Sequence, residues 1–313
     1  MARQEWRQDR PGRRHFLRSI AATAGVCLLS DAATVPATDR AQRLHMGAQT
    51  NAWGVPIKDY GRLLEIAETL VRLGYRGFET NVASLSSEAE RAADCRRDFE
   101  ARHIQLIAPH TGAVLYDKDK WDAELANLER IAGFTAQMGA AYLIVSGKEV
   151  PHPDRKLDLG AVRAKAEALN QLGAAVRKDG LRLCYHNHEA EFRDKPTEMS
   201  YLLSETDPSH VWLCFDVGHC YGFEDPAEFT AANFRRIAIF HLRDETRSPA
   251  GKVIYAEPGK GGINLKGILA PLLHSDWEGW LEIEEEQYYP RPMPDPDKAM
   301  KEWREYLKQL TDV

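Results

Sequence analysis

Short apolar runs that favour β-strands alternate with amphipathic stretches along most of the chain. The β-favouring runs cover residues 44–51, 74–81, 104–112, 140–147, 181–188, 211–219, 236–244 and 279–286. Between them, the segment from Asp59 to Leu73 places its leucine, isoleucine and valine side chains along one helical face, and residues 121–138 and 159–176 behave similarly. Gly74, Gly139 and Gly180 stand where these helices should end. The pattern predicts repeated strand–helix units.

The number and spacing of these units predict the fold class. Strand starts fall roughly 25 to 45 residues apart, about the length of one βα unit. Eight units without a long linker predict an α/β fold, a single-domain (β/α)8 TIM barrel over residues 38–313. A doubly wound sheet would normally carry a glycine-rich phosphate turn after its first strand, and GAQTNAWG is not one. A proline-rich loop at 290–297 leads into a last predicted helix, 298–310.

The first 37 residues do not follow the barrel pattern. The basic segment RRHFLR at 13–18 precedes an apolar run at 20–29 and a small-residue stretch that reaches residue 37. This order indicates an export signal, with a disordered basic tail as the alternative. The paired arginines before Phe-Leu resemble a twin-arginine signal. We expect residues 1–37 to be a signal peptide and processing region, cleavage between residues 30 and 41, and a periplasmic mature protein.

Composition and charge limit the partners. The chain has 313 residues, 43% apolar and 28% charged, enough for a large core. No apolar run approaches the ~20 residues of a membrane span, so we expect no stable span. Removing residues 1–37 removes six arginines and three acidic residues and changes the formal charge from −6 to −9. Because an acidic protein repels phosphate backbones, we expect no nucleic-acid partner and a small-molecule substrate instead.

Four cysteines remain beyond residue 37: Cys95, Cys184, Cys214 and Cys220. No two are spaced as CxxC, so a structural zinc site is not indicated. The periplasm permits disulfides, but twin-arginine substrates fold before export, as the resemblance of the signal implies. We therefore expect reduced, buried thiols.

Polar side chains gather where predicted strands five to eight end. Because successive side chains in a strand alternate between its faces, His186, Asp216, His241 and Glu284 can all point into the barrel. They lie at the C-terminal ends of the strands, where barrel active sites are built. Two imidazoles and two carboxylates suit a divalent metal ion, and Mn, Zn, Co, Fe or Mg would be accepted. The alternative is that each histidine is an ordinary hydrogen-bonded residue of the barrel. The presence of such polar side chains at the ends of four strands disfavours this alternative.

The same alternation predicts the layer below these ends. The side chains expected to point inward there are Cys184, Trp212, Cys214, Ile237 and Ile239. Glu282 shares the face of Glu284 one layer deeper and needs a partner in the barrel. Arg182 is inward by the same alternation and is the expected partner.

Four motifs carry a resemblance to a known family: FDVGH (215–219), HLRD (241–244), EPGKGGIN (257–264) and GWLEIE (279–284). In this order and spacing they resemble the xylose-isomerase-like TIM-barrel superfamily of sugar phosphate isomerases and epimerases, inosose dehydratases and endonuclease-four-type enzymes. The resemblance covers about residues 44–310. It implies that Asp216, His241 and Glu284 are three of four metal ligands.

The fourth ligand position departs from the epimerase pattern. Many sugar epimerases close the fifth strand with a Glu that is both ligand and acid/base, and the matching residue here is His186. Symmetrical proton exchange between two carboxylates is therefore in doubt, and His188 or Glu191 is expected to supply a displaced catalytic base. The expected substrate-binding residues are His219, His110, Glu79 and Arg243, of which His110 and Glu79 have a plain structural role as an equal alternative.

These residues predict removal of a proton next to a carbonyl. A chelated metal acts as a Lewis acid that stabilises the enediolate, while a nearby His or Glu moves the proton. Sugar phosphates are scarce outside the cytoplasm, and the chain shows no dedicated phosphate cradle. The leading hypothesis is a divalent-metal-dependent sugar isomerase/epimerase-type enzyme acting on an unphosphorylated carbohydrate. The alternative, favoured by His186, is a lyase or hydratase (dehydratase) acting on 3-keto-glycosides or inosose-like keto-sugars.

Two further functions are more distant alternatives. An endonuclease of this superfamily needs a three-metal cluster, and strand four ends in Ser146-Gly147-Lys148 without the matching His. A non-catalytic carbohydrate-binding protein would bind sugar in a way that a chelator does not change. The resemblance is also compatible with a homo-oligomer.

Overall fold

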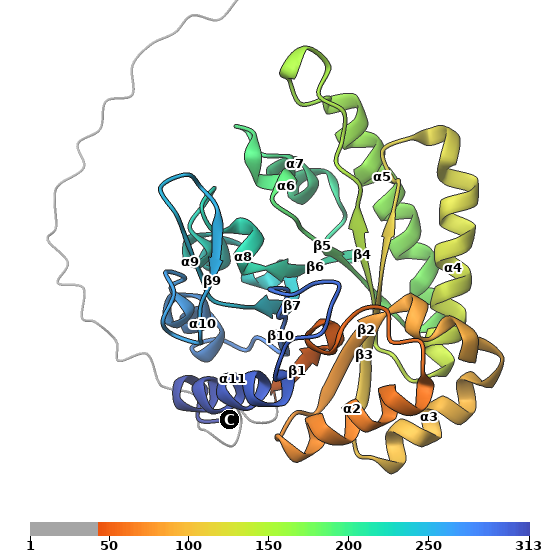
Figure 1. Cartoon of the computed structure of the whole chain (residues 1–313). Coiled ribbons are helices and arrows are strands. Elements are labelled where there is room, and N and C mark those ends of the chain that lie inside the picture. Colours follow the sequence, from red (N-terminus) through yellow and green to blue (C-terminus); the bar gives the residue numbers. More distant parts are fainter. Residues whose placement is uncertain (1–42) are drawn as a thin grey trace, which may run out of the picture. The chain divides into compact units, whose positions relative to one another are not determined.

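The computed structural model describes residues 43–313, so the predicted signal peptide lies outside the described residues. Eight parallel strands close into a barrel in the order β1-β10-β7-β6-β5-β4-β3-β2 (Figure 1). The barrel strands are β1 (Leu44–Gln49), β2 (Gly77–Asn81), β3 (Gln105–Ala113), β4 (Tyr142–Gly147), β5 (Arg182–His186), β6 (Val211–Asp216), β7 (Ile237–Leu242) and β10 (Gly279–Ile283). The predicted (β/α)8 TIM barrel is confirmed.

Helices connect the strands and cover the outside of the barrel (Figure 1). They are α2 (Tyr60–Arg72), α3 (Ala92–Ala101), α4 (Trp121–Gln137), α5 (Leu159–Val176), α6 (Ala190–Arg193), α7 (Glu198–Glu205), α8 (Val217–Cys220), α9 (Pro226–Asn233), α10 (Leu265–Leu273) and α11 (Pro296–Thr311). Single 3-10 turns are η1 (Thr50–Trp53), η2 (Val82–Ser84), η3 (Ser86–Arg91), η4 (Lys118–Lys120), η5 (Pro153–Arg155), η6 (Arg177–Asp179) and η7 (Phe234–Arg236). The strands β8 (Glu245–Arg247) and β9 (Val253–Tyr255) form an antiparallel hairpin after β7, which the sequence did not predict.

Local signals explain where the first of these helices begins and ends. The side chain of Asp59 accepts a hydrogen bond from the N–H of Arg62 at 3.2 Å and caps the start of α2. Gly74 follows its end with a φ of +90°, a conformation that costs other residues energy. Between these limits Leu63, Ile66 and Leu70 are buried. The spacing of apolar residues thus packs α2 onto the barrel.

Alternation along the strands separates two layers of buried side chains. Ile144, Cys184, Cys214 and Ile239 form a cluster inside the barrel. Leu183, Phe215, Phe240 and Leu281 belong to the larger cluster beneath the helices. The four cysteines of the described chain are buried and free, as predicted.

Two predictions about the lower layer are wrong. Ile237 packs in the outer cluster because the pairing of β6 with β7 shifts register, and Ala238 takes the inward place. Arg182 begins β5 at the open lower end of the barrel, where it is exposed and lies 5.5 Å over the ring of Trp212. It does not reach Glu282, whose carboxyl oxygens have no hydrogen-bond partner within residues 43–313. Burial and the neighbouring carboxylate of Glu79 raise the pKa of Glu282 well above its usual value.

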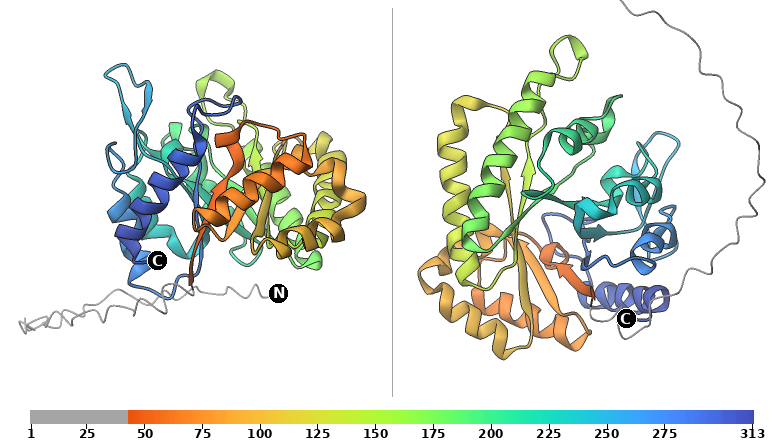
Figure 2. Two further views of the ribbon diagram at one scale, coloured as in Figure 1. Left: turned by 60° about the horizontal axis from the view of Figure 1, so that its bottom comes forward. Right: turned by 180° about the vertical axis from the view of Figure 1, so that it is seen from behind.

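The loops at the C-terminal ends of the strands lie together. The left view of Figure 2 shows the segments after β4, β7 and β10 projecting from the same end of the barrel. In a parallel barrel this end collects the polar residues that close each strand. None of the helices between residues 43 and 313 has the length and apolar character to cross a membrane.

A close approach of α5 to the segment before β6 can be tested with two glycines. A Cβ added at Gly173 would lie 2.3 Å from the carbonyl oxygen of His210, whereas one added at Gly133 in α4 meets nothing within 4 Å. Gly173→Ala should lower the free energy of unfolding by roughly 1–3 kcal/mol, because neither backbone can move freely. Gly133→Ala should raise it by about 0.5–1 kcal/mol through better helix propensity. Urea denaturation measures both, and equal effects would contradict the close approach.

Candidate active site

Four strand ends bring His186, Asp216, His241 and Glu284 together. Each offers one ligand atom, these atoms lie within 4.8 Å of one another, and all four side chains are buried. Nε2 of His186 lies 3.8 Å from Oδ2 of Asp216 and 3.6 Å from Oε2 of Glu284. Nδ1 of His241 lies 2.7 Å from the same Glu284 oxygen. The side chains meet as their strand positions predicted, while their role as ligands stays a prediction.

The donor set fits a divalent cation. Nε2 of His186 is buried without a hydrogen-bond partner among residues 43–313, so in the tautomer protonated on Nδ1 it is free to bind a cation. Burial lowers the pKa of His186 well below its usual value and keeps the imidazole neutral, the form that binds metals. Burial also raises the pKa of Asp216 to about 8, against the lowering effect of Arg243. A cation beside Asp216 would restore the carboxylate form.

A chain of hydrogen bonds joins the two imidazoles behind this cluster. Nε2 of His241 lies 2.7 Å from one oxygen of Glu79, whose other oxygen lies 2.9 Å from Nδ1 of His110. Nε2 of His110 is 2.7 Å from Oγ of Ser146, which is 3.4 Å from Nδ1 of His186. Partners of this kind fix the orientation and basicity of histidine ligands. Glu79 and His110, predicted to contact substrate, thus also support the two histidines.

Asp216 is held by contacts from three sides. Arg243 donates from Nε and Nη2 to its two oxygens at 3.2 and 2.5 Å, and the N–H of His219 donates to Oδ1 at 2.8 Å. The side chain of Asn187 donates to the backbone carbonyl of Asp216 at 3.0 Å and accepts from its N–H at 2.9 Å. Sequence reasoning missed Asn187, although its position directly after the ligand position 186 was a usable signal.

Two adjoining clefts open at this end of the barrel. The metal-side cleft, of about 290 Å³, is lined by His186 and Glu284 together with Asn51 and His110. The outer cleft, of about 410 Å³, is lined by residues of the loops after β4 and β5 and by His219. The residues that line both clefts are Gly112, Ser146, Lys148 and His188. Glu79 and Arg243 line neither, so a direct contact of theirs with substrate stays a prediction.

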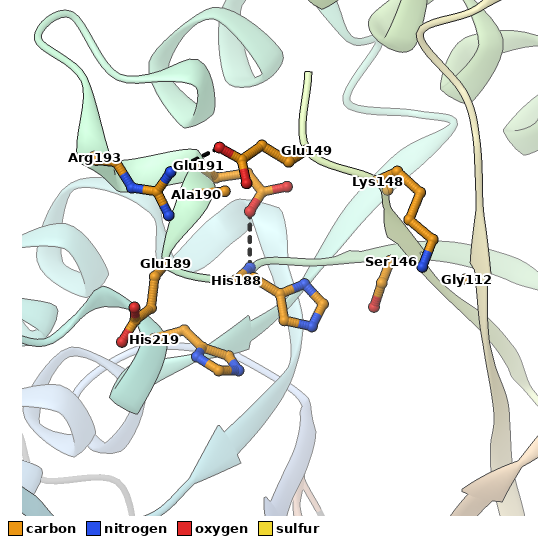
Figure 3. A pocket seen from close by; sticks show the side chains of 11 residues that line it. Gly112, Ser146, Lys148, Glu149, His188, Glu189, Ala190, Glu191, Arg193 and His219 are labelled. Atoms are coloured by element: carbon orange, nitrogen blue, oxygen red, sulfur yellow. Dashed lines mark hydrogen bonds and ion pairs between the residues drawn. The ribbon is translucent and has the colours of Figure 1, made fainter. Parts of the chain in front are cut away.

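His188 stands where the two clefts meet. Figure 3 shows its ring pointing into the outer cleft, with Ser146 on one side and His219 on the other. The ring centroids of His188 and His219 are 4.9 Å apart, and that of His186 is 5.0 Å from His188. Burial lowers the pKa of His188, so the imidazole is neutral at pH 7 and able to accept a proton. Burial likewise lowers the pKa of His219 well below its usual value.

Glu191 is bound on both of its oxygens. Tyr185 donates its hydroxyl to Oε1 at 2.5 Å, and the backbone N–H of His188 donates to Oε2 at 2.9 Å. Nζ of Lys165 lies 3.6 Å from Oε1 and 2.5 Å from Oε1 of Glu198. This buried network anchors the backbone that carries His188. A catalytic role of Glu191 itself stays a prediction.

The fold and the polar cluster define a TIM-barrel protein with a mixed histidine and carboxylate centre. The chain belongs to the xylose isomerase-like TIM barrel family, whose model matches residues 67–310. Inosose dehydratase of Clostridium perfringens is 29% identical over 245 residues, which cover 70% of this chain and 81% of that protein.

Solved structures share the fold at low sequence identity. The zinc-bound IolI protein aligns with a TM-score of 0.69 and 14% identity, over 86% of this chain and 98% of that one. The 3-keto-D-glucoside 4-epimerase YcjR from E. coli aligns with a TM-score of 0.65 and 17% identity, over 87% of this chain and all of that one (100%).

The family assignment confirms the predicted class of activity. The chain is an enzyme of the sugar isomerase/epimerase or dehydratase type. A divalent metal is supported by the cluster of four ligand atoms, without identifying the metal.

Metal content tests the four-residue centre and the role of Glu79, which hydrogen-bonds His241. Asp216→Ala and His241→Ala should lose stoichiometric metal, and Glu79→Gln should weaken metal affinity by roughly 10- to 100-fold because His241 loses its carboxylate partner. Competition with a fluorescent chelator measures the affinity. Glu149→Gln, at a half-exposed ion pair with Arg193, is the matched control and should bind metal normally. Equal metal loads in all variants would contradict the assignment.

Proposed function

We propose that the protein is a divalent-metal-dependent dehydratase or lyase, which eliminates a group β to the carbonyl of an unphosphorylated keto-sugar or keto-cyclitol. The observation that carries this proposal is the position of His188, which lines both clefts and whose ring centroid lies 5.0 Å from that of His186. Elimination can remove a proton and protonate a leaving group from one side, as isomerisation also can, whereas epimerisation needs groups on opposite faces. The inosose dehydratase relatives support the same choice.

In the proposed mechanism, one set of residues holds the cation and another residue transfers the proton. A divalent cation held by His186, Asp216, His241 and Glu284 would polarise the carbonyl oxygen as a Lewis acid. Neutral His188 takes the proton from the adjacent carbon, and the C–H electron pair becomes a carbon–carbon double bond as the β C–O bond breaks. The departing oxygen then takes a proton from the His188 imidazolium. Glu191 accepts a hydrogen bond from the backbone of His188 and holds it in place. Asn187 holds the backbone of Asp216 in the same way.

Isomerisation or epimerisation, the leading hypothesis from the sequence, is the second candidate. Glu286 favours it, because this carboxylate lines the metal-side cleft and could act as a second base. Its Oε2 is 3.7 Å from Nε2 of His219 and also bonds Arg243.

We further propose that residues 1–37 export the protein to the periplasm through a twin-arginine pathway. The RRHFLR segment and the apolar run that follows support the proposed export. Replacing Arg13 and Arg14 together by lysine should leave the protein in the cytoplasmic fraction, and unchanged fractionation would contradict the proposal.

Proton NMR in deuterated water tests the reaction type. The wild type is given metal and either 2-keto-myo-inositol or 3-ketoglucose. The substrate should then lose its α-proton signal and a hydroxyl group, and an unsaturated product should form. His188→Asn should slow this by roughly 10²- to 10⁴-fold, the usual contribution of a general base. Exchange that retains every substituent would favour the isomerase or epimerase. Binding without any exchange, unaffected by a chelator, would favour the non-catalytic protein.

Two variants of Glu191 test whether this residue is the catalytic base or only positions His188. Glu191→Gln should retain most activity, because the amide oxygen still accepts from the His188 N–H, while Glu191→Ala should lose roughly 10- to 100-fold through misplacement. Since burial lowers the pKa of His188 from 6.5, the rate should fall only as pH drops below that value and the imidazole gains a proton. pH–rate profiles of both variants should keep this limb. A Glu191→Gln enzyme as inactive as Glu191→Ala would make Glu191 the base.

A further inference from the structure

The outer cleft is larger than the metal-side cleft and lies beyond the reacting centre. Their volumes are about 410 and 290 Å³. His186 and Glu284 line only the metal-side cleft, whereas Ala190 and Arg193 line only the outer one. A single ring bound at the centre would therefore leave the outer cleft to solvent.

The two clefts adjoin at the residues that line both of them. Ser146, Lys148 and His188 line both of them, so the two clefts meet beside the proposed base. In Figure 3, Lys148 lies beside Ser146, while Glu149 and Arg193 form the far wall. The bond between two linked units of a substrate would then lie beside His188.

Charged and polar side chains stand among apolar surface in the wall of the outer cleft. Glu149 accepts a hydrogen bond from Nη1 of Arg193 at 2.7 Å, and both side chains are about half exposed. Nε2 of His219 is buried, has no hydrogen-bond partner within the described chain and lies 3.7 Å from Oε2 of Glu286. No aromatic side chain other than the two imidazoles lines this cleft, so it lacks a Phe, Tyr or Trp platform for a flat ring.

We propose that the outer cleft is a subsite for a second sugar unit, so that the substrate is a keto-disaccharide whose glycosidic bond lies beside His188. This inference rests on the proposed function and specifies its substrate class. A 3-keto-pyranoside carries its glycosidic oxygen on C1, the carbon β to the carbonyl, and the proton to be removed on C2. With the keto ring in the metal-side cleft, the second sugar occupies the outer cleft as the leaving group.

The elimination is balanced without an oxidant or another co-reactant. His188 takes the C2 proton, and the C2–H electron pair becomes the C1–C2 double bond. The C1–O bond breaks, and its electron pair leaves on the glycosidic oxygen, which takes the proton back from His188. The products are an unsaturated 2-hydroxy-3-keto sugar and an intact free sugar.

Filling the outer cleft tests the subsite without touching the metal ligands. Ala190→Trp, with Ala190→Leu as a milder variant, should lower kcat/KM for 3-keto-maltose by at least about tenfold and change that for 3-ketoglucose by less than about threefold. Ala101→Trp places the same side chain at an exposed position at the end of α3 and should affect neither. Metal content and thermal melting verify that each variant is folded and loaded.

The outcomes separate this inference from the proposed function. Wild-type turnover of 3-ketoglucose or 2-keto-myo-inositol without preference for 3-keto-maltose, or equal losses on both substrates in Ala190→Trp, would overturn the subsite and leave the proposed function intact. A preference for an aryl 3-keto-glucoside over 3-keto-maltose would overturn the second-sugar assignment. If no ketone reacts, calorimetry with maltose decides: binding by the wild type that Ala190→Trp abolishes supports the subsite, and no binding refutes it.

Discussion

The burial of two imidazoles and two carboxylates with their ligand atoms within 4.8 Å of one another is the constraint on which the site depends. Desolvating a charged carboxylate costs several kcal/mol unless an opposite charge compensates. Arg243 supplies a guanidinium on one side of Asp216, and burial still raises the pKa of that carboxyl to about 8. A divalent cation between the four side chains would compensate the remaining negative charge, and this supports the proposed metal centre.

The surroundings of the centre hold its members by contacts between neighbouring strands. Glu79, His110 and Ser146 connect His241 to His186 across the barrel interior. Asn187 connects the end of β5 to the backbone of Asp216 at the end of β6. These links let the barrel present an imidazole at position 186, where the epimerases that it resembles carry a carboxylate.

The distribution of free proton-transfer groups around the centre is uneven. His188 and His219 are neighbours on one side, while His110 is engaged by Glu79 and Ser146. Glu191 serves the backbone of His188 and is itself held by Tyr185. The outer cleft opens on the side of the paired imidazoles. In the proposed elimination, proton transfer and leaving-group departure would share this side, which connects the proposed reaction type to the proposed second-sugar subsite.

The sequence by itself determined the barrel and the four converging residues, because strand alternation and the common direction of parallel strands are local, periodic properties. It did not determine the place of Ile237, since a register shift between β6 and β7 depends on how the two strands pack. The sequence pattern also paired Glu282 with Arg182. In the structure Arg182 is the first residue of β5, where it is exposed and lies over the ring of Trp212. Only the tertiary structure brought Lys165 to Glu191 and opened the outer cleft, because contacts between distant loops leave no periodic trace in the chain.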